Sequence, residues 1–512
     1  MFRNYFKIAL RNLLRHKAFS GINIAGLALG MTASLFIFLW VNDERSIDGF
    51  HKNSAQLFHV YERSYYDGKV DAGYSTQGLL AEELKRVIPE VQFASGLEYT
   101  SAPGTLSTFE AGGKVNKMQG MFAGPDFFRM FSYPLLQGNT KEALNAPAAI
   151  AVSRKMAEIF FGNPEKAIGQ TIIFENKETL KVTAVFENIP PNSSQQFDFL
   201  RSWTDFIQQN KWVNNWGNTS PLTFVQLQKN ADPVKVESRI KDFIYRYAPK
   251  SEGSRTELAL QPYSEKYLHS SFKNGYVDGG RIEYVRLFTF VAFFILLIAC
   301  INFMNLATAQ SVKRSKEIGL RKVIGAIRSS LIGQFIGEAM LLTGLAVVIA
   351  FLLVILLLPA FNNLTGKQLS VPVTQPYFWW ASFVMFIVTG FVSGSYPALF
   401  LSSLKPVKVL KGSLKFSRAS TLFRQILVVS QFSLSIILIV GTIVIYRQMN
   451  YVQTKNLGYD RDNLVYIPIE GDLAKNYALF KDKALRMDAV ANVSKMRNSP
   501  TVIEHHNSSI GW

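Results

Sequence analysis

The residue types that most often carry catalysis or hold metals are few in this chain, and they form no known pattern. His51, His59 and His269 occur singly, and neither a His-Glu-x-x-His zinc motif nor a Gly-x-Ser-x-Gly nucleophile turn is present. Cys300 is the single cysteine, which excludes an internal disulfide framework and a metal site built from several cysteines. We therefore expect no catalytic residue, no cofactor and no metal.

Gly-Lys pairs at residues 68–69, 113–114 and 366–367 are the nearest approach to a phosphate-binding loop. A nucleotide-binding loop needs Gly-x-x-x-x-Gly-Lys followed by Ser or Thr, because the backbone cradles the phosphates and the hydroxyl binds Mg²⁺. None of the three pairs has the Ser or Thr. The sequence therefore predicts a protein that is not itself an ATPase.

The most informative polar segment is basic and reads Lys313-Arg-Ser-Lys-Glu-Ile-Gly-Leu-Arg-Lys-Val-Ile-Gly-Ala326. Ile318, Val323 and Ile327 could form one apolar face of a short helix, with basic side chains on the rest. Such an element could lie on a membrane surface or dock into a cleft of a cytoplasmic partner. Composition alone favours a plain positively charged cytoplasmic loop.

The elements around this segment are long apolar runs. The chain is 48% hydrophobic and 18% charged, below the soluble average of about 25%. A net charge of +18 on such a chain argues against a nucleic-acid-binding protein and for a membrane protein. A bilayer core of about 30 Å needs about 20 helical residues. Five runs are long enough: 22–41, 285–309, 331–359, 377–401 and 426–446.

The first run could instead be a cleaved signal peptide, but its 20 residues exceed the usual apolar region of about 7–15. We therefore expect an uncleaved anchor and five spans. Glu338 lies early in the third span, where a charge is costly and often functional, although pairing near the interface explains it equally well. Asn302 and Asn305 lie near the end of the second span and could hydrogen-bond between helices.

The positive charge is concentrated in three short segments. Residues 1–20, 311–330 and 401–424 together hold 17 Lys and Arg against one Glu, whereas residues 42–284 hold 27 basic and 28 acidic residues. Short cytoplasmic loops are rich in Lys and Arg. Five spans with a cytoplasmic N-terminus place all three segments on the cytoplasmic side, so residues 42–284 are expected outside.

Residues 42–284 have the mixed pattern of a large α+β domain with several hairpins. Its clearest elements are a strand over Leu57–Arg63, a helix to Phe161 with Ser153 as N-cap, a hairpin of Thr171–Phe174 with Leu180–Phe186, and a helix over Asp232–Tyr247. We expect a binding or force-transmitting domain without catalysis.

The basic segment resembles the R-x-K-E-I-G-x-R-K-x-x-G-A signature of the FtsX-like permease family, which includes MacB-type and lipoprotein-releasing ABC transporter permeases. Gly394-Ser-Tyr-Pro-Ala398, followed by Leu404-Lys-Pro-Val407 and Leu410-Lys-Gly412, resembles the family's exit from the fourth span. The outside domain resembles the MacB-type periplasmic core domain, in Phe50-His-Lys-Asn-Ser54, Gly169-Gln-Thr-Ile172 and Val182-Thr-Ala-Val-Phe-Glu-Asn-Ile-Pro-Pro191.

The resemblance implies a permease subunit in the bacterial inner membrane that uses a separate cytoplasmic ABC ATPase. The loop between the second and third spans would contact that ATPase through Lys316, Glu317, Ile318, Gly319, Arg321, Lys322 and Gly325. ATP hydrolysis would move the outside domains, for export or efflux, in a dimeric permease or a pseudo-dimer of two repeats. A periplasmic adaptor and membrane lipid are further expected partners, and nucleic acid is not.

The sequence leaves two other functions open. One keeps the permease fold but makes it a regulator of a periplasmic hydrolase or a lipoprotein-release permease. The other is a membrane sensor, which the chain fits less well because its longest cytoplasmic segment has about 24 residues and leaves no room for an output domain.

The fifth span begins a second copy of the pattern. Phe423-Arg-Gln precedes it as Phe2-Arg-Asn precedes the first span, and Asn463–Ile469 reads as a strand that opens a second outside domain. We expect five spans from an eight-span, two-repeat protein truncated at Trp512. The predicted parts are a basic N-terminus (1–20), a first span (21–41), a core domain (42–284), a permease domain (285–420), a fifth span (421–446) and a second outside domain (447–512).

Overall fold

The computed structural model describes residues 17–100, 106–250, 253–313, 315–403 and 418–456, together with Arg11, Gly458 and all of 463–496 except 468 and 470. The chain divides into two compact units. The helical unit comprises residues 1–45 and 283–460, and the sheet unit comprises 46–282 and 461–512. The basic residues predicted at 404–417 lie outside the described residues.

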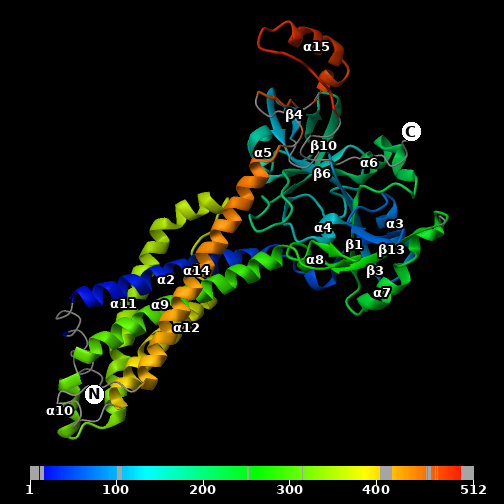
Figure 1. Cartoon of the computed structure of the whole chain (residues 1–512). Coiled ribbons are helices and arrows are strands. Elements are labelled where there is room, and N and C mark those ends of the chain that lie inside the picture. The colour runs from blue at the N-terminus through cyan, green and yellow to red at the C-terminus, as the bar shows by residue number, and fades with distance from the viewer. Residues whose placement is uncertain are drawn as a thin grey trace. The chain divides into compact units, whose positions relative to one another are not determined.

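The described residues of the helical unit form five helices that are long and apolar enough to cross a membrane (Figure 1). They are α2 (Lys17–Ser46), α9 (Arg281–Lys313), α11 (Arg328–Thr365), α12 (Pro376–Ser403) and α14 (Arg418–Thr454). The short helix α10 (Ser315–Val323) joins α9 to α11. The prediction of five apolar helices long enough to span is confirmed for the described residues.

Small residues let these helices approach closely, as is common in membranes. Gly26, Gly30 and Ser34 follow one another at four-residue spacing along α2 and face α9. A Cβ added at Gly30 would lie 2.7 Å from the Cβ of Ala299, and the Ser34 hydroxyl donates to the Ala292 carbonyl at 3.1 Å. In α14, by contrast, no residue of the most apolar window is buried by the described part of the chain.

The sheet unit is built on a mixed sheet of 13 strands. The strands are β1 (Leu57–Tyr66), β2 (Lys69–Gly73), β3 (Val91–Tyr99), β4 (Ser107–Ala111), β5 (Lys114–Met118), β6 (Gly120–Ala123), β7 (Leu135–Gln137), β8 (Ala149–Ser153), β9 (Thr171–Phe174), β10 (Glu178–Phe186), β11 (Phe199–Ser202), β12 (Leu222–Leu227) and β13 (Ser254–Pro262). Their order is β13-β1-β12-β3-β6-β11-β8-β10-β9-β4-β5, with β2 beside β1 and β7 beside β10. The hairpin β14 (Phe272–Lys273) with β15 (Tyr276–Val277) is separate.

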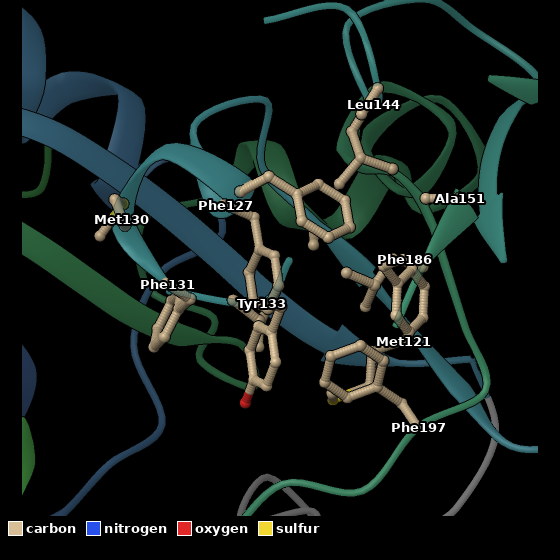
Figure 2. Packing of buried hydrophobic residues seen from close by; sticks show 14 of the residues in the cluster. Met121, Phe127, Met130, Phe131, Tyr133, Leu144, Ala151, Phe186 and Phe197 are labelled. Atoms are coloured by element: carbon tan, nitrogen blue, oxygen red, sulfur yellow. The ribbon is translucent and has the colours of Figure 1, made fainter. Parts of the chain in front are cut away.

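Short helices accompany the strands: α3 (Leu80–Val87), α4 (Phe127–Met130), α5 (Arg154–Phe161), α6 (Trp203–Gln209), α7 (Pro233–Ile240) and α8 (Tyr263–Lys266). Helix α15 (Tyr477–Leu485) lies in the later part of the chain. Aromatic rings fill the largest buried cluster, where Phe127 and Phe131 stack at 4.7 Å and Phe186 lies 5.4 Å from Phe197 (Figure 2). The unit is therefore held by large apolar side chains, as expected for a domain without disulfides.

Several sequence predictions for this unit are confirmed. The hairpin forms between β9 and β10, and the Ser153 hydroxyl caps α5 by accepting from the Met156 N–H at 3.2 Å. The helix predicted over Asp232–Tyr247 is wrong beyond Ile240. There the Lys241 carbonyl accepts from the Leu258 N–H of β13 at 2.9 Å, and a separate 3-10 turn follows at Phe243–Arg246.

The strand predicted at Asn463–Ile469 is also wrong for the described residues, which belong to no strand. Leu464, Val465 and Tyr466 are 60–78% exposed. A strand is stable only when its backbone pairs with a neighbour, and none of the described strands pairs with this segment.

Candidate functional site

The basic segment forms α10, and one apolar side chain anchors it to the helical unit. Ile318 is 4% exposed and packs in a cluster with Leu331 and Phe335 of α11 and with Ala398 and Leu401 of α12. Gly319 is buried as well. This anchor fixes the orientation of α10 against the ends of two long helices.

The end of α10 has a defined cap. The Ala326 N–H donates to the Arg321 carbonyl at 3.0 Å, and the Gly325 N–H donates to the Lys322 carbonyl at 3.2 Å. Gly325 has a φ of +101°, a conformation that glycine adopts without the steric cost of a Cβ. The Gly-Ala pair that ends the signature therefore turns the chain from α10 into α11.

Polar side chains tie α10 to the same two helices. Arg321 donates to Glu317 at 2.6 Å and to Gln334 of α11 at 2.9 Å. The Lys322 ammonium donates to the Ser402 carbonyl of α12 at 2.7 Å, and Arg328 donates to the Ser402 hydroxyl at 3.3 Å. Burial, helped by the nearby Arg328 charge, lowers the pKa of Lys322. Arg321, Lys322 and Arg328 therefore form hydrogen bonds within the chain.

The predicted apolar face of the loop needs correction. Ile318 points inward, whereas Val323 is 61% and Ile327 67% exposed. Leu320 and Ile324 are exposed beside them, at 53% and 77%. Residues 320, 323 and 324 share the spacing that places side chains on one helix face. Leu320, Val323, Ile324 and Ile327 together form what we call the α10 surface.

The exit motif of the fourth span lies against this anchor. A Cβ added at Gly394 would lie 2.7 Å from the Cβ of Ala339, so α11 and α12 touch closely there. Ala398, from the same motif, is fully buried in the Ile318 cluster. Two motifs about 70 residues apart in the sequence thus form one structure, although no motif predicted their contact.

Of the other predicted site residues, the side chain of Lys316 lies outside the described residues. Glu317 is exposed and accepts from Arg321, and Glu338 is half-buried in α11. Asn302 lies next to Gly26 of α2, and Asn305 Oδ1 is buried with no hydrogen-bond partner among the described residues.

Sequence reasoning missed the Gly26-x-x-x-Gly30 contact, although that spacing is a recognised helix-packing pattern.

The histidines of the sheet unit have structural surroundings. His51 Nδ1 accepts from the Ser132 N–H at 3.1 Å, and burial lowers the pKa of His51 to about 4. His59 is fully buried between the rings of Tyr74 and Phe224, at 4.5 and 4.3 Å. Among the described residues there is no group of three or more His, Cys, Asp or Glu that could hold a metal ion.

Two family models match the chain. One described as MacB-like periplasmic core domain matches residues 20–243, and one described as FtsX-like permease C-terminal matches residues 289–406. The first covers most of α2 and most of the sheet unit. The second covers most of α9 and all of α10, α11 and α12.

Relatives agree with these matches. The macrolide export ATP-binding/permease protein MacB of Pasteurella multocida (strain Pm70) is 25% identical over 287 residues, which are 56% of this chain and 41% of that protein. The ABC transporter permease YvrN of Bacillus subtilis (strain 168), itself uncharacterized, is 22% identical over 430 residues, which are 80% of this chain and 99% of that protein. The matched part of this chain spans half or less of the length of the first MacB relatives.

Solved structures similar to part of the chain include the periplasmic region of MacB from Actinobacillus actinomycetemcomitans. It is 14% identical with a TM-score of 0.28, covering 41% of this chain and 89% of that one. The extracellular domain of the ABC-type transporter YknZ is 12% identical with a TM-score of 0.27, covering 38% of this chain and 98% of that one.

The fold and the matched domains define a multi-pass membrane protein with a large periplasmic-type α/β domain. The family is equally clear, since both domains of the resemblance are matched in order. The chain belongs to the MacB/FtsX-type ABC transporter permeases.

Proposed function

We propose that this chain is the permease subunit of a MacB/FtsX-type ABC transporter and that a separate cytoplasmic ATPase docks on the α10 surface. The observation that carries this proposal is the exposure of four apolar side chains on a segment that Ile318, Arg321 and Lys322 hold in place. An apolar helix face presented on a fixed support is a common way to fill a groove in a partner.

The proposed roles of the predicted residues follow from their contacts. Leu320, Val323 and Ile324 contact the ATPase, with exposed Glu317 at the edge of the contact. Ile318, Arg321 and Lys322 act as positioning residues, because each is bonded or packed inside the chain. Gly325 sets the direction in which the chain leaves α10 and enters α11.

In this proposal ATP hydrolysis by the partner displaces α10, and the displacement passes along α11 and α12 toward the sheet unit. Export or efflux follows from movement of the periplasmic domain. The proposal places the N-terminus and α10 in the cytoplasm and residues 42–284 outside. The distribution of positive charge supports that orientation.

Co-purification tests the docking surface. The full chain carrying Ile324→Asp is co-expressed with candidate ABC ATPases from the source genome, and the bound ATPase is measured after detergent extraction. A buried carboxylate in an apolar contact is costly, so we expect at least a tenfold loss of association, or about 1.4 kcal/mol. The variant should fold, because Ile324 is 77% exposed.

Leu364→Asp is the matched control, since Leu364 is 83% exposed at the other end of α11. It should retain the ATPase. The double variant Glu317→Ala with Arg321→Ala tests the support of α10 rather than its surface. Unchanged association and ATP turnover in both Ile324→Asp and the double variant would contradict the proposal.

A further inference from the structure

The end of α11 farthest from α10 carries an ion-pair joint. Gly366 caps α11 with a φ of +65°, and Lys367 follows it. The Lys367 ammonium lies 2.5 Å from Asp43 Oδ2 and 2.7 Å from Glu44 Oε1. One cation thus bridges two carboxylates in the last turn of α2, just before the chain passes into the sheet unit at Ser46.

This joint is largely shielded from water. The Lys367 side chain is 19% exposed and that of Glu44 is 2% exposed, so water screens their attraction poorly. Removing one partner of such a pair leaves the other charge buried without compensation. An exposed pair of the same helical unit, Arg286 with Glu283, has side chains 60% and 59% exposed and should contribute little.

Other contacts hold the same turns of α2. The rings of Phe36 and Phe361 of α11 stack at 4.6 Å, and the Lys367 ammonium lies 5.8 Å from the Trp40 ring. The Asn42 amide donates to the Tyr377 hydroxyl at the start of α12 at 3.2 Å. The last turns of α2 therefore contact α11, the loop that follows α11, and α12. These contacts and the Lys367 ion pairs are called the α2 clamp.

The loop that carries Lys367 is itself fixed in place. Asn362 donates through its amide nitrogen to the Leu369 carbonyl at 2.9 Å and accepts from the Leu369 N–H at 3.0 Å. The Lys367 N–H donates to the Asn362 carbonyl at 3.2 Å. Lys367 thus moves with the end of α11 rather than independently of it.

Helix α11 connects the two ends. It begins at Arg328, which bonds Ser402 beside α10, and ends two residues before Lys367. Its 38 residues correspond to about 57 Å at 1.5 Å per residue, with Pro359 inside the helix eight residues before Lys367. A displacement imposed at one end of such a helix reaches the other end wherever the contacts there are tight.

We propose that Lys367 is a positioning residue of the transport cycle: its ion pairs with Asp43 and Glu44 pass the movement of α11 to the exit of α2 and so to the sheet unit. This rests on the proposed function, because that function supplies the movement. The joint is not needed for ATPase docking, which uses the opposite end of α11.

The test measures the movement directly. Nitroxide labels are placed at Val384→Cys on α12 and Val234→Cys on α7, both exposed, in a Cys300→Ala background. Their distance distribution is recorded by electron–electron double resonance in the reconstituted complex with the ATPase, with and without ATP. The test variant combines Lys367→Met with Glu44→Gln, so that the buried Glu44 carboxylate is not left charged without Lys367. The control combines Arg286→Met with Glu283→Gln.

We expect ATP to change the distance distribution in the unsubstituted chain and in the control. The change should be lost in the Lys367→Met/Glu44→Gln variant, while ATPase association and ATP turnover persist. A variant that responds to ATP like the unsubstituted chain overturns the role of Lys367 alone. An unsubstituted chain that does not respond contradicts the proposed function, and the clamp with it.

Discussion

The two ends of α11 use charge and apolar surface differently. At the α10 end Arg321 and Lys322 are bonded inside the chain, whereas the four apolar side chains of the α10 surface are exposed and Ile318 packs inward. At the other end Phe36 and Phe361 stack on each other and a nearly buried ion pair holds α2, while Leu364 of α11 is exposed. Exposed apolar side chains suit contact with another molecule, whereas a buried ion pair suits a fixed joint within one molecule.

The contrast separates two kinds of defect that a variant can cause. A change at the α10 surface should alter association with the ATPase. A change at the α2 clamp should leave association intact and alter the movement that ATP produces. Variants that loosen α11 from α12 should affect both ends together and therefore have the largest effect.

Gly394→Val should cause this largest effect, because it separates the two helices that both ends share. A Cβ at Gly394 would lie 2.7 Å from the Cβ of Ala339, and overpacking of this kind typically costs about 1–3 kcal/mol. We expect a lower thermal midpoint in detergent and loss of ATPase association. Gly337→Val in α11 is the control, since a Cβ there meets nothing within 4 Å. Equal behaviour of the two variants would argue against close packing at Gly394.

Glu62→Gln should change the stability of the sheet unit without touching either end of α11. Burial raises the pKa of Glu62 to about 7, above its ordinary value of 4.5. The folded carboxyl therefore holds its proton at a pH where the unfolded one has lost it, and its contribution to stability falls as pH rises from about 4.5 to 7.

We expect Glu62→Gln to stabilise the sheet unit by roughly 1–2 kcal/mol above pH 7 and hardly at all near pH 4. Denaturant unfolding followed by sheet-unit fluorescence at both pH values measures the difference. ATPase association should stay unchanged. A stabilisation that is independent of pH would disprove the assigned cause.

Gly325→Ala should weaken coupling by loosening the turn between α10 and α11. A side chain at a φ of +101° is strained, at a cost of about 1 kcal/mol or more. We expect a several-fold loss of ATPase association with the fold retained. Gly333→Ala in α11 is the matched control, because a Cβ there also meets nothing within 4 Å and no positive φ is required. Equal loss in both variants would count against the cap.

Asn362→Ala should have the smallest effect on ATPase association, because it acts only at the clamp end. It removes two hydrogen bonds to Leu369, each contributing about 0.5–1.5 kcal/mol. We expect normal ATPase association but a broader nitroxide distance distribution and a smaller response to ATP. A reduced association would show that the two ends are not separable.

The sequence predicted the parts of this molecule that depend on local pattern. Hydrophobic run length indicated the five spans, and the signatures at 313–326 and 394–398 located α10 and the end of α12. Ile318 faces inward while Val323 faces out, against the predicted shared face, because residues five apart on a helix of 3.6 residues per turn lie about 140° apart.

The α2 clamp was invisible for a different reason. Lys367 and Asp43 are 324 residues apart, and each alone looks like a charge at the end of a span. In the sequence, Gly366-Lys367 is only an incomplete phosphate-binding motif. Pairing over such distances is set by the packing of α2 against α11, which no local pattern encodes.

Site-specific photocrosslinking tests the central claim most directly. A benzophenone amino acid is incorporated at position 324 of the full chain, or at 364 as the control, and the complex with the ABC ATPase is irradiated in membranes. We predict a crosslink between position 324 and the ATPase subunit and none from position 364. A crosslink from neither position, or from 364 alone, would contradict docking on the α10 surface.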